Sequence, residues 1–80
     1  MPDVIHEPGQ QRFILQQEGA SCVLDYRIDG TRINFTHTFV PPELRGKGLA
    51  EKLVRRGLKW ADEQQLSKEA DCWYVARFLR

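Results

Sequence analysis

The period of the apolar residues changes once along this chain, and that change limits the folds open to it. From Ser21 to Phe39, apolar and polar residues alternate, which is the pattern of β-strands with one buried face. From Leu49 onward, apolar residues recur every three or four positions, which places them along one side of a helix. The chain therefore has to combine an antiparallel sheet with at least one helix packed against it.

Three strands are predicted before the change of period. A short apolar run at residues 13–15 ends at Glu18-Gly19, and Asp29-Gly30 is a strong signal for a two-residue hairpin turn. The residues expected to alternate onto one face of the second and third strands are Cys22, Leu24, Tyr26 and Ile28, then Ile33, Phe35, His37 and Phe39. The first half of the chain should form a three-strand antiparallel meander.

An amphipathic helix is predicted from about Gly48 to Gln64. Its apolar half contains Leu49, Ala50, Leu53, Val54, Gly57, Leu58, Trp60 and Ala61. Residues 66–71 are ambiguous, but if residues 67–71 form a strand, the helix is a crossover and this last strand pairs in parallel with the strand ending at Val40. Residues 73–79 can form a final helix with Val75, Phe78 and Leu79 turned inward. The expected fold class is α+β.

The size and composition of the chain exclude several classes of protein. Its 80 residues contain no internal repeat or linker, so residues 1–80 are expected to form one domain, as a monomer or weak dimer. Twelve Lys and Arg against 11 Asp and Glu give a net charge of +1, which provides no global argument for binding nucleic acid or an anionic membrane. Cys22 and Cys72 have neither CxxC spacing nor a histidine cluster beside them, so we expect no metal site and reduced thiols.

No segment of the sequence is suited to membrane insertion or export. The N-terminal MPDVIHEPGQQ has no apolar core of a signal peptide, and no apolar stretch approaches the roughly 18 residues that a membrane span requires. A soluble, cytoplasmic protein with no membrane partner is therefore expected.

The stretch VPPELRGKGLA, residues 40–50, predicts an anion site. Glycine disfavours a helix by about 1 kcal/mol relative to alanine, so glycines at a helix start suggest that something must approach the backbone closely. A helix N-terminus presents unpaired N–H groups, and Arg45 and Lys47 stand beside this one. Phosphate suits such a site. The Walker loop and the dinucleotide fingerprint are both rejected, because their glycine spacings are missing.

The hexapeptide Arg45 to Ala50, RGKGLA, resembles the R/Q-x-x-G-x-G/A signature of the GNAT superfamily of acetyl-CoA-dependent N-acetyltransferases. The wider stretch from Phe35 to Ala61 resembles a minimal, single-domain branch with an HTxVPPELRGKGLA core, and Cys72-Trp73-Tyr74-Val75 resembles its C-S-Y-V segment. The likeness covers roughly residues 12–80. This chain departs from it at residues 68–71, where apolar residues and a proline are usual, and in lacking a His-Pro tail.

The resemblance implies a cofactor, acetyl-CoA, and a place for it. The strand before the glycine loop would splay from its parallel neighbour in a V, and its backbone would pair with the pantetheine arm of CoA. The loop amides would hold the pyrophosphate, and the acceptor amine would arrive from the opposite side. The implied cofactor residues are Phe39, Val40, Arg45, Gly46, Lys47, Gly48, Leu49 and Ala50.

Two residues are candidates for the chemistry. A lone histidine on an apolar face is more often a core residue, but His37 matches the family pattern and could act as the general base that deprotonates an amine. Cys72 precedes the predicted last helix, where a thiol has a lowered pKa and can act as a nucleophile or as the acid that protonates departing CoA. An inert, buried thiol is the alternative for Cys72, and Tyr74 is a rival proton donor.

The expected function is acetyl transfer to an amine, either on a small molecule or at a lysine or N-terminus of a protein, with direct attack on the thioester preferred to a route through Cys72. One alternative is a CoA-binding sensor or adaptor with little turnover. Another is a small RNA-binding domain, which is disfavoured because only the loop and one helix face are basic and no strand shows an exposed aromatic pair.

Overall fold

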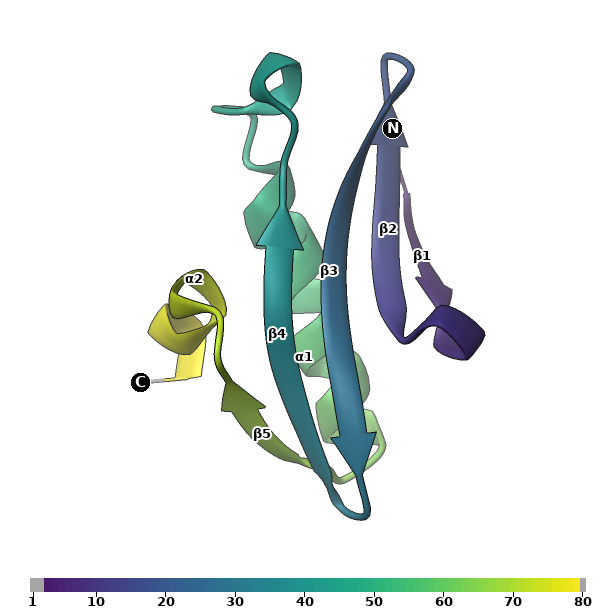
Figure 1. Cartoon of the computed structure of the whole chain (residues 1–80), viewed down its shortest axis with the longest axis vertical. Coiled ribbons are helices and arrows are strands. Elements are labelled where there is room, and N and C mark those ends of the chain that lie inside the picture. The colour runs from purple at the N-terminus through teal and green to yellow at the C-terminus, as the bar shows by residue number, and fades with distance from the viewer. Residues whose placement is uncertain (1–2, 80) are drawn as a thin grey trace.

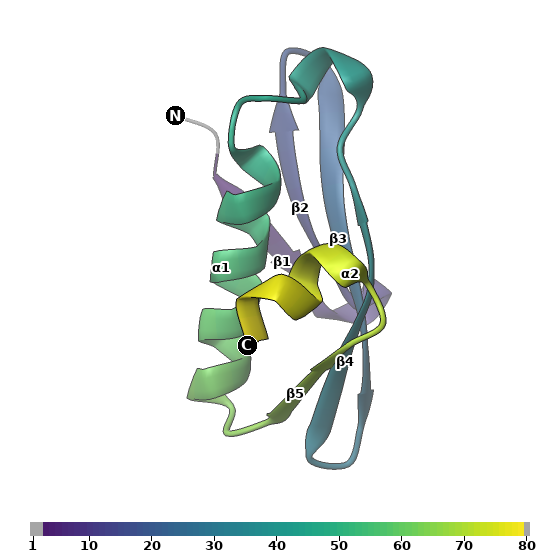
Figure 2. The same cartoon turned by 90° about the vertical axis from the view of Figure 1, so that its left-hand side faces the viewer.

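Over residues 3–79, which the computed structural model describes, the chain forms a sheet of five strands with both α-helices on one of its faces (Figures 1 and 2). The strands are β1 (Val4–Glu7), β2 (Arg12–Gln17), β3 (Ala20–Asp29), β4 (Arg32–Phe39) and β5 (Ser67–Ala70). The helices are α1 (Leu49–Glu63) and α2 (Trp73–Ala76). Three short 3-10 helices, η1 to η3, cover Pro8–Gln10, Pro42–Leu44 and Arg77–Leu79.

The topology of the sheet confirms the predicted fold class. The strands lie in the order β1-β2-β3-β4-β5, with antiparallel pairing from β1 to β4 and a parallel pair between β4 and β5. The meander of β2, β3 and β4, the crossover helix α1 and the parallel last strand were all expected from the sequence. Strand β1 was not expected, because four residues carry too few alternations to be distinguished from a loop. None of the helices within residues 3–79 is long and apolar enough to cross a membrane.

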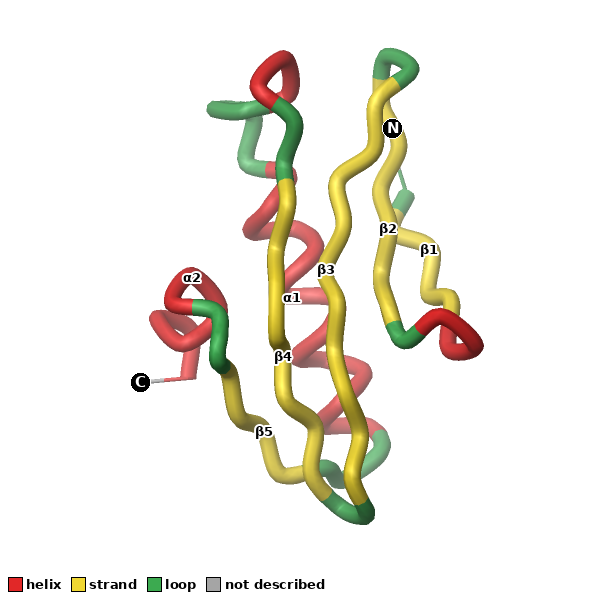
Figure 3. The backbone as a smooth tube through the Cα atoms, viewed as in Figure 1, coloured by secondary structure: helices red, strands yellow, loops and turns green. Residues whose placement is uncertain are grey.

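Strands β4 and β5 separate before β4 ends, so they form a V. Their pairing ends at Phe35 and Ala70, and the C=O of Phe35 then accepts the N–H groups of both Asp71 and Cys72 at 3.1 and 3.2 Å. The chain leaves the sheet there and enters α2, while β4 continues to Phe39 (Figure 3). The final helix is shorter than predicted, since α2 ends at Ala76 and η3 follows.

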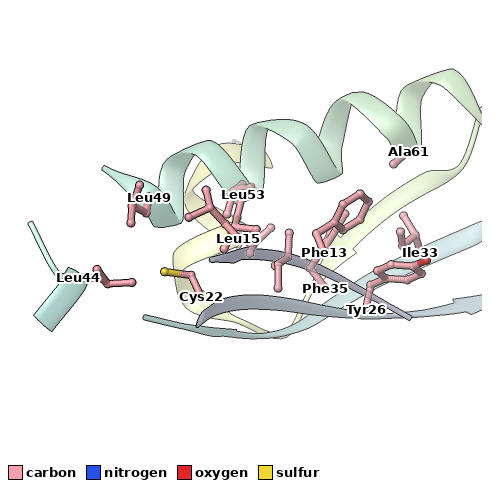
Figure 4. Packing of buried hydrophobic residues seen from close by; sticks show 13 residues of the cluster. Phe13, Leu15, Cys22, Tyr26, Ile33, Phe35, Leu44, Leu49, Leu53 and Ala61 are labelled. Carbon is pink, nitrogen blue, oxygen red and sulfur yellow. The ribbon is translucent and has the colours of Figure 1, made fainter. Parts of the chain in front are cut away.

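The core lies between α1 and the inner face of the sheet (Figure 4). Its fully buried large side chains include Phe13, Leu15, Leu24, Ile33, Phe35, Leu53, Val54 and Val75. Gly57 stands in the middle of α1 and faces the sheet closely, since a Cβ there would lie 2.9 Å from Cδ2 of Leu24. Real Cβ atoms do not tolerate that distance, so glycine permits this packing.

An aromatic cluster joins the unexpected strand β1 to the core. The ring of His6 stacks on Phe13 with centroids 4.2 Å apart and meets Trp60 edge-on at 4.5 Å. Its Nε2 shares a hydrogen bond of 2.6 Å with the hydroxyl of Tyr26, which is 2% exposed. Burial, with a smaller contribution from the positive charge of Arg56, lowers the pKa of His6. The cluster therefore favours the neutral form of the His6 imidazole.

Acidification should destabilise the protein through His6. In the unfolded chain His6 binds a proton near pH 6.5, whereas in the folded chain its pKa is lower. The stability that the packing of neutral His6 contributes is therefore fully present above pH 6.5, and it is lost as the pH falls through the lower pKa of the folded state. Thermal melts between about pH 7.5 and 5 should show a steeper loss of Tm in the parent than in His6→Phe. Equal slopes in the two proteins would contradict this assignment.

Candidate functional site

A β-bulge in β4 decides where the predicted catalytic histidine lies. Tyr26 of β3 is opposite Phe35, but the preceding residue, Asp25, is opposite His37, so Thr36 is an extra residue in β4. The extra residue reverses the alternation of side chains beyond it. His37 is therefore exposed on the open face of the sheet, and the prediction that it shares the inner face with Phe35 is wrong.

The same bulge turns the backbone of Thr38 and Val40 toward the gap left by β5. The N–H and C=O groups of successive strand residues point to opposite neighbouring strands. The N–H of Tyr26 points toward β2, since it donates to the C=O of Gln11, the residue before β2, with N···O 3.0 Å. His37 and Phe39 are the residues of β4 directly opposite residues of β3 whose backbone groups point toward β4. Their own N–H and C=O groups therefore point toward β3. The intervening Thr38, and then Val40, present their N–H and C=O groups at the open edge. The sequence had suggested Phe39 and Val40 for this position.

The loop between β4 and α1 relies on two left-handed glycines. Gly46 has φ +81° and Gly48, the residue before the first turn of α1, has φ +74°, a region that side chains with a Cβ rarely adopt. The first intrahelical bond runs from the N–H of Lys52 to the C=O of Gly48 at 3.2 Å, and no side chain within residues 3–79 caps the helix. The N–H groups of residues 49–51 thus point out of the helix start, where the dipole favours an anion.

Two adjoining hollows connect this helix start with the open edge of β4. One, of about 380 Å³, lies beside the edge, and the other, of about 310 Å³, lies against the glycine loop. They share Val40, Arg45, Ala50 and Tyr74, so they form one continuous surface, called the groove below. The other residues that line it are Thr38, Phe39, Leu44, Gly46, Gly48, Leu49, Cys72 and Trp73.

Cys72 lies in the groove at the start of α2, directly beside β4. Its thiol donates to the Thr38 hydroxyl with Sγ···Oγ1 3.5 Å. Burial by itself raises the pKa of the Cys72 thiol. Hydrogen bonds that stabilise the thiolate, made with the side chain of Thr38 and with the backbone of Val75, Tyr74 and Thr38, outweigh that effect, so the pKa of Cys72 lies below its usual value. Cys22, by contrast, is fully buried, and burial raises the pKa of its thiol, so it is a packing residue.

The two basic residues of the loop have different surroundings. The guanidinium of Arg45, which lines the groove, donates from Nε to the C=O of Val40 at 3.1 Å. Lys47 was predicted beside the same anion site, but its ammonium pairs at 3.1 Å with Glu18 in the β2–β3 turn, and it does not line the groove.

The structure thus brings together Cys72 and most of the predicted cofactor residues, but it does not bring His37 to them. Phe39, Val40, Arg45, Gly46, Gly48, Leu49 and Ala50 line the groove. Sequence reasoning missed Thr38 because the alternation it counted ignored the bulge. It also assigned no role in the site to Trp73, which is 72% exposed and lines the groove. Its position next to Cys72 was the available signal.

Comparison with known proteins identifies the family of this chain. Residues 12–80 match the family model of the GCN5-related N-acetyl-transferases. Protein NATD1 of Bos taurus is 32% identical over 80 residues, which cover 96% of this chain and 71% of that protein. The human NATD1 protein is 31% identical with the same coverage.

A solved structure shows the same fold. The solution NMR structure of a GCN5-like protein from Staphylococcus aureus superposes with a TM-score of 0.74 at 29% identity and covers 96% of this chain and 76% of that one. Together with the family match over most of the chain, this likeness shows that the protein belongs to the GCN5-related N-acetyltransferase family.

Proposed function

We propose that this protein transfers an acetyl group from acetyl-CoA to an amine, with the amine attacking the thioester directly. The observation that carries the proposal is the groove, in which the open edge of β4, the glycine loop before α1 and the Cys72 thiol form one continuous surface. Family membership supports the reaction class.

The residues of the groove fit the chemistry of acetyl-CoA. The edge groups of Thr38 and Val40 can pair with the amides of the pantetheine arm, as a neighbouring strand would. The N–H groups at the start of α1 and the guanidinium of Arg45 suit the pyrophosphate. Trp73 and Tyr74 supply apolar surface along the way. When bound, acetyl-CoA supplies an activated acetyl thioester.

His37 and Cys72 would act from different faces of β4. His37 stands on the open face, from which an acceptor can approach without crossing the helices, and it would take the proton from the amine nitrogen. Cys72 would give its proton to the departing sulfur, a role that the lowered pKa of its thiol favours. The N–C bond forms as the C–S bond breaks, and the two protons go to His37 and to the released CoA.

The open face also offers a polar hollow to the acceptor. It has a volume of about 490 Å³ and is lined in part by Asp25, Arg27 and Thr36, of which Asp25 is the cross-strand partner of His37. Gln11 contributes to the same hollow, and its buried Oε1 has no hydrogen-bond partner among the described residues. Oxygen atoms that accept hydrogen bonds, such as those of Asp25 and Gln11, suit an amine substrate, because its N–H groups are donors.

The experiment that tests the proposal is incubation with isotope-labelled acetyl-CoA and a panel of amines, including a lysine peptide, an N-terminal peptide and a polyamine. We expect time-dependent acetylation of at least one amine, detected by mass spectrometry, with an equal amount of CoA released. The control is the same mixture without protein. Binding of CoA without acetylation of any amine would instead support a sensor or adaptor, and absence of CoA binding would contradict both functions.

A further inference from the structure

The open face of the sheet carries a row of apolar side chains that nothing in residues 3–79 covers. The row consists of Ile5, Ile14, Val23 and Phe39, called the apolar row below. These residues are direct cross-strand partners over β1, β2, β3 and β4. Both helices pack on the other face (Figure 2). The two ends of the row are well exposed, Ile5 at 53% and Phe39 at 46%.

A second row lies two residues along the strands and alternates in charge. This polar row consists of Glu7, Arg12, Asp25 and His37, which are again direct cross-strand partners over the same four strands. Its order is acid, base, acid and imidazole. Within the chain, Arg12 forms an ion pair with Glu7.

Both rows complement themselves under a two-fold rotation. Each row has its midpoint between β2 and β3. A two-fold axis parallel to the strands and above that midpoint places the same row of a second copy over it, with the order of the residues reversed. The apolar row then meets apolar residues only, since Ile14 faces the partner's Val23. In the polar row, Glu7 faces the partner's His37 and Arg12 faces the partner's Asp25, so every acid meets a base or an imidazole.

We propose that the open face binds a second copy of this chain, sheet against sheet, through these two rows. An isologous contact of this kind requires one surface that complements itself, as the two rows do. Aligned packing of two sheets is a favoured geometry, with about 10 Å between them. Eight residues from each copy are fewer than the roughly 20 to 30 of a standard interface, so the dimer is weak and depends on protein concentration.

The dimer would cover the acceptor side of the site, a consequence that rests on the proposed function. The partner's Glu7 would face His37, and the partner's Ile5 would lie against Phe39, which lines the groove. The second copy and an amine acceptor would thereby compete for the open face.

The test exchanges the charges at the centre of the polar row. In Arg12→Asp, the new carboxylate faces the partner's Asp25 twice in each dimer. In Asp25→Arg, the new guanidinium faces the partner's Arg12 twice. In an equimolar mixture of the two variants, a mixed dimer again pairs opposite charges at both places. A defect within one chain, such as the ion pair with Glu7 that is lost in Arg12→Asp, is present both when the variant is alone and when it is in the mixture. The mixture therefore differs only in the contacts between chains.

Sedimentation velocity from about 5 µM to 1 mM, with one variant carrying a fluorescent label, measures the association. The parent should dimerise with a Kd of roughly tens to hundreds of micromolar, each variant alone about tenfold more weakly, and the mixture within about threefold of the parent. Ile14→Thr, which keeps a strand-forming residue at the centre of the apolar row, should weaken dimerisation by a similar factor.

Three results would overturn the proposal. The parent could remain monomeric at 1 mM, the mixture could associate no better than its components, or Ile14→Thr could leave the association unchanged. Circular dichroism melts of each variant establish that it is folded. Because association is measured without acetyl-CoA, its outcome is independent of whether the protein is an acetyltransferase.

Discussion

Replacing Ala50 by glutamate should abolish binding of CoA while the protein stays folded. Ala50 lines both parts of the groove and is the second residue of α1. A carboxylate there would occupy the helix N-terminus and repel a pyrophosphate, and we expect the Kd for CoA to rise by about 100-fold or more, equivalent to about 2.7 kcal/mol. An acid in the first turn of a helix stabilises it by about 0.3–1 kcal/mol, so Tm should not fall.

Calorimetry with CoA gives the affinity, and Ala50→Gln is the matched control with the same size and no charge. The parent should also show a thermal shift, since a ligand at 100 times its Kd adds about 2.7 kcal/mol to stability. Gly48→Glu should lose CoA as well, but its left-handed φ of +74° adds backbone strain to the electrostatic effect. An Ala50→Glu protein that binds CoA like the Gln variant would show that the helix start does not hold the pyrophosphate.

Removing the imidazole of His37 should reduce acetyl transfer far more than removing the thiol of Cys72. In the direct route, loss of the general base in His37→Ala costs on the order of 100-fold or more in kcat/KM, whereas Cys72→Ala keeps partial activity. Affinity for CoA should change little in His37→Ala, because the side chain lies on the open face and does not line the groove. Added imidazole should restore part of its activity, which a structural role would not allow.

Mass spectrometry of the intact protein separates the two routes. Transfer of acetyl from one thiol to another is nearly thermoneutral and leaves the attack by the amine still to be made, so a route through Cys72 offers little advantage. After mixing with acetyl-CoA alone, the parent should therefore carry no stoichiometric acetyl group. An adduct on Cys72 that amine removes at the rate of turnover would replace the direct route with a covalent one.

Much of the fold could be predicted because each major element has its own period. The alternation in β3 and most of β4, and the helical spacing of α1, reflect burial of one face, and the structure buries Leu24, Phe35 and Leu53 as that pattern requires. Strand β1 could not be predicted in the same way. It is held by a contact that sequence order does not reveal, the packing of His6 on Phe13 and Trp60.

The loop of the candidate site could also be predicted, since glycine is the residue that adopts the left-handed backbone found at Gly46 and Gly48. The direction of a long side chain could not. Lys47 stands in the expected loop, but its ammonium pairs with Glu18, and only the folded chain brings these two residues together.

The sequence by itself determined the types and order of β2, β3, β4 and α1 and the position of the glycine loop, because these depend on local backbone preferences and on one-sided burial. Tertiary structure alone decided which face of β4 carries His37. Alternation along a strand predicts which face of the sheet a side chain occupies only while the pairing register is unbroken. The extra residue, Thr36, is recognised only from the residues of β3 that pair with β4. Those partners are fixed by packing across the sheet, so this one residue turned Thr38 toward Cys72 and His37 to the open face.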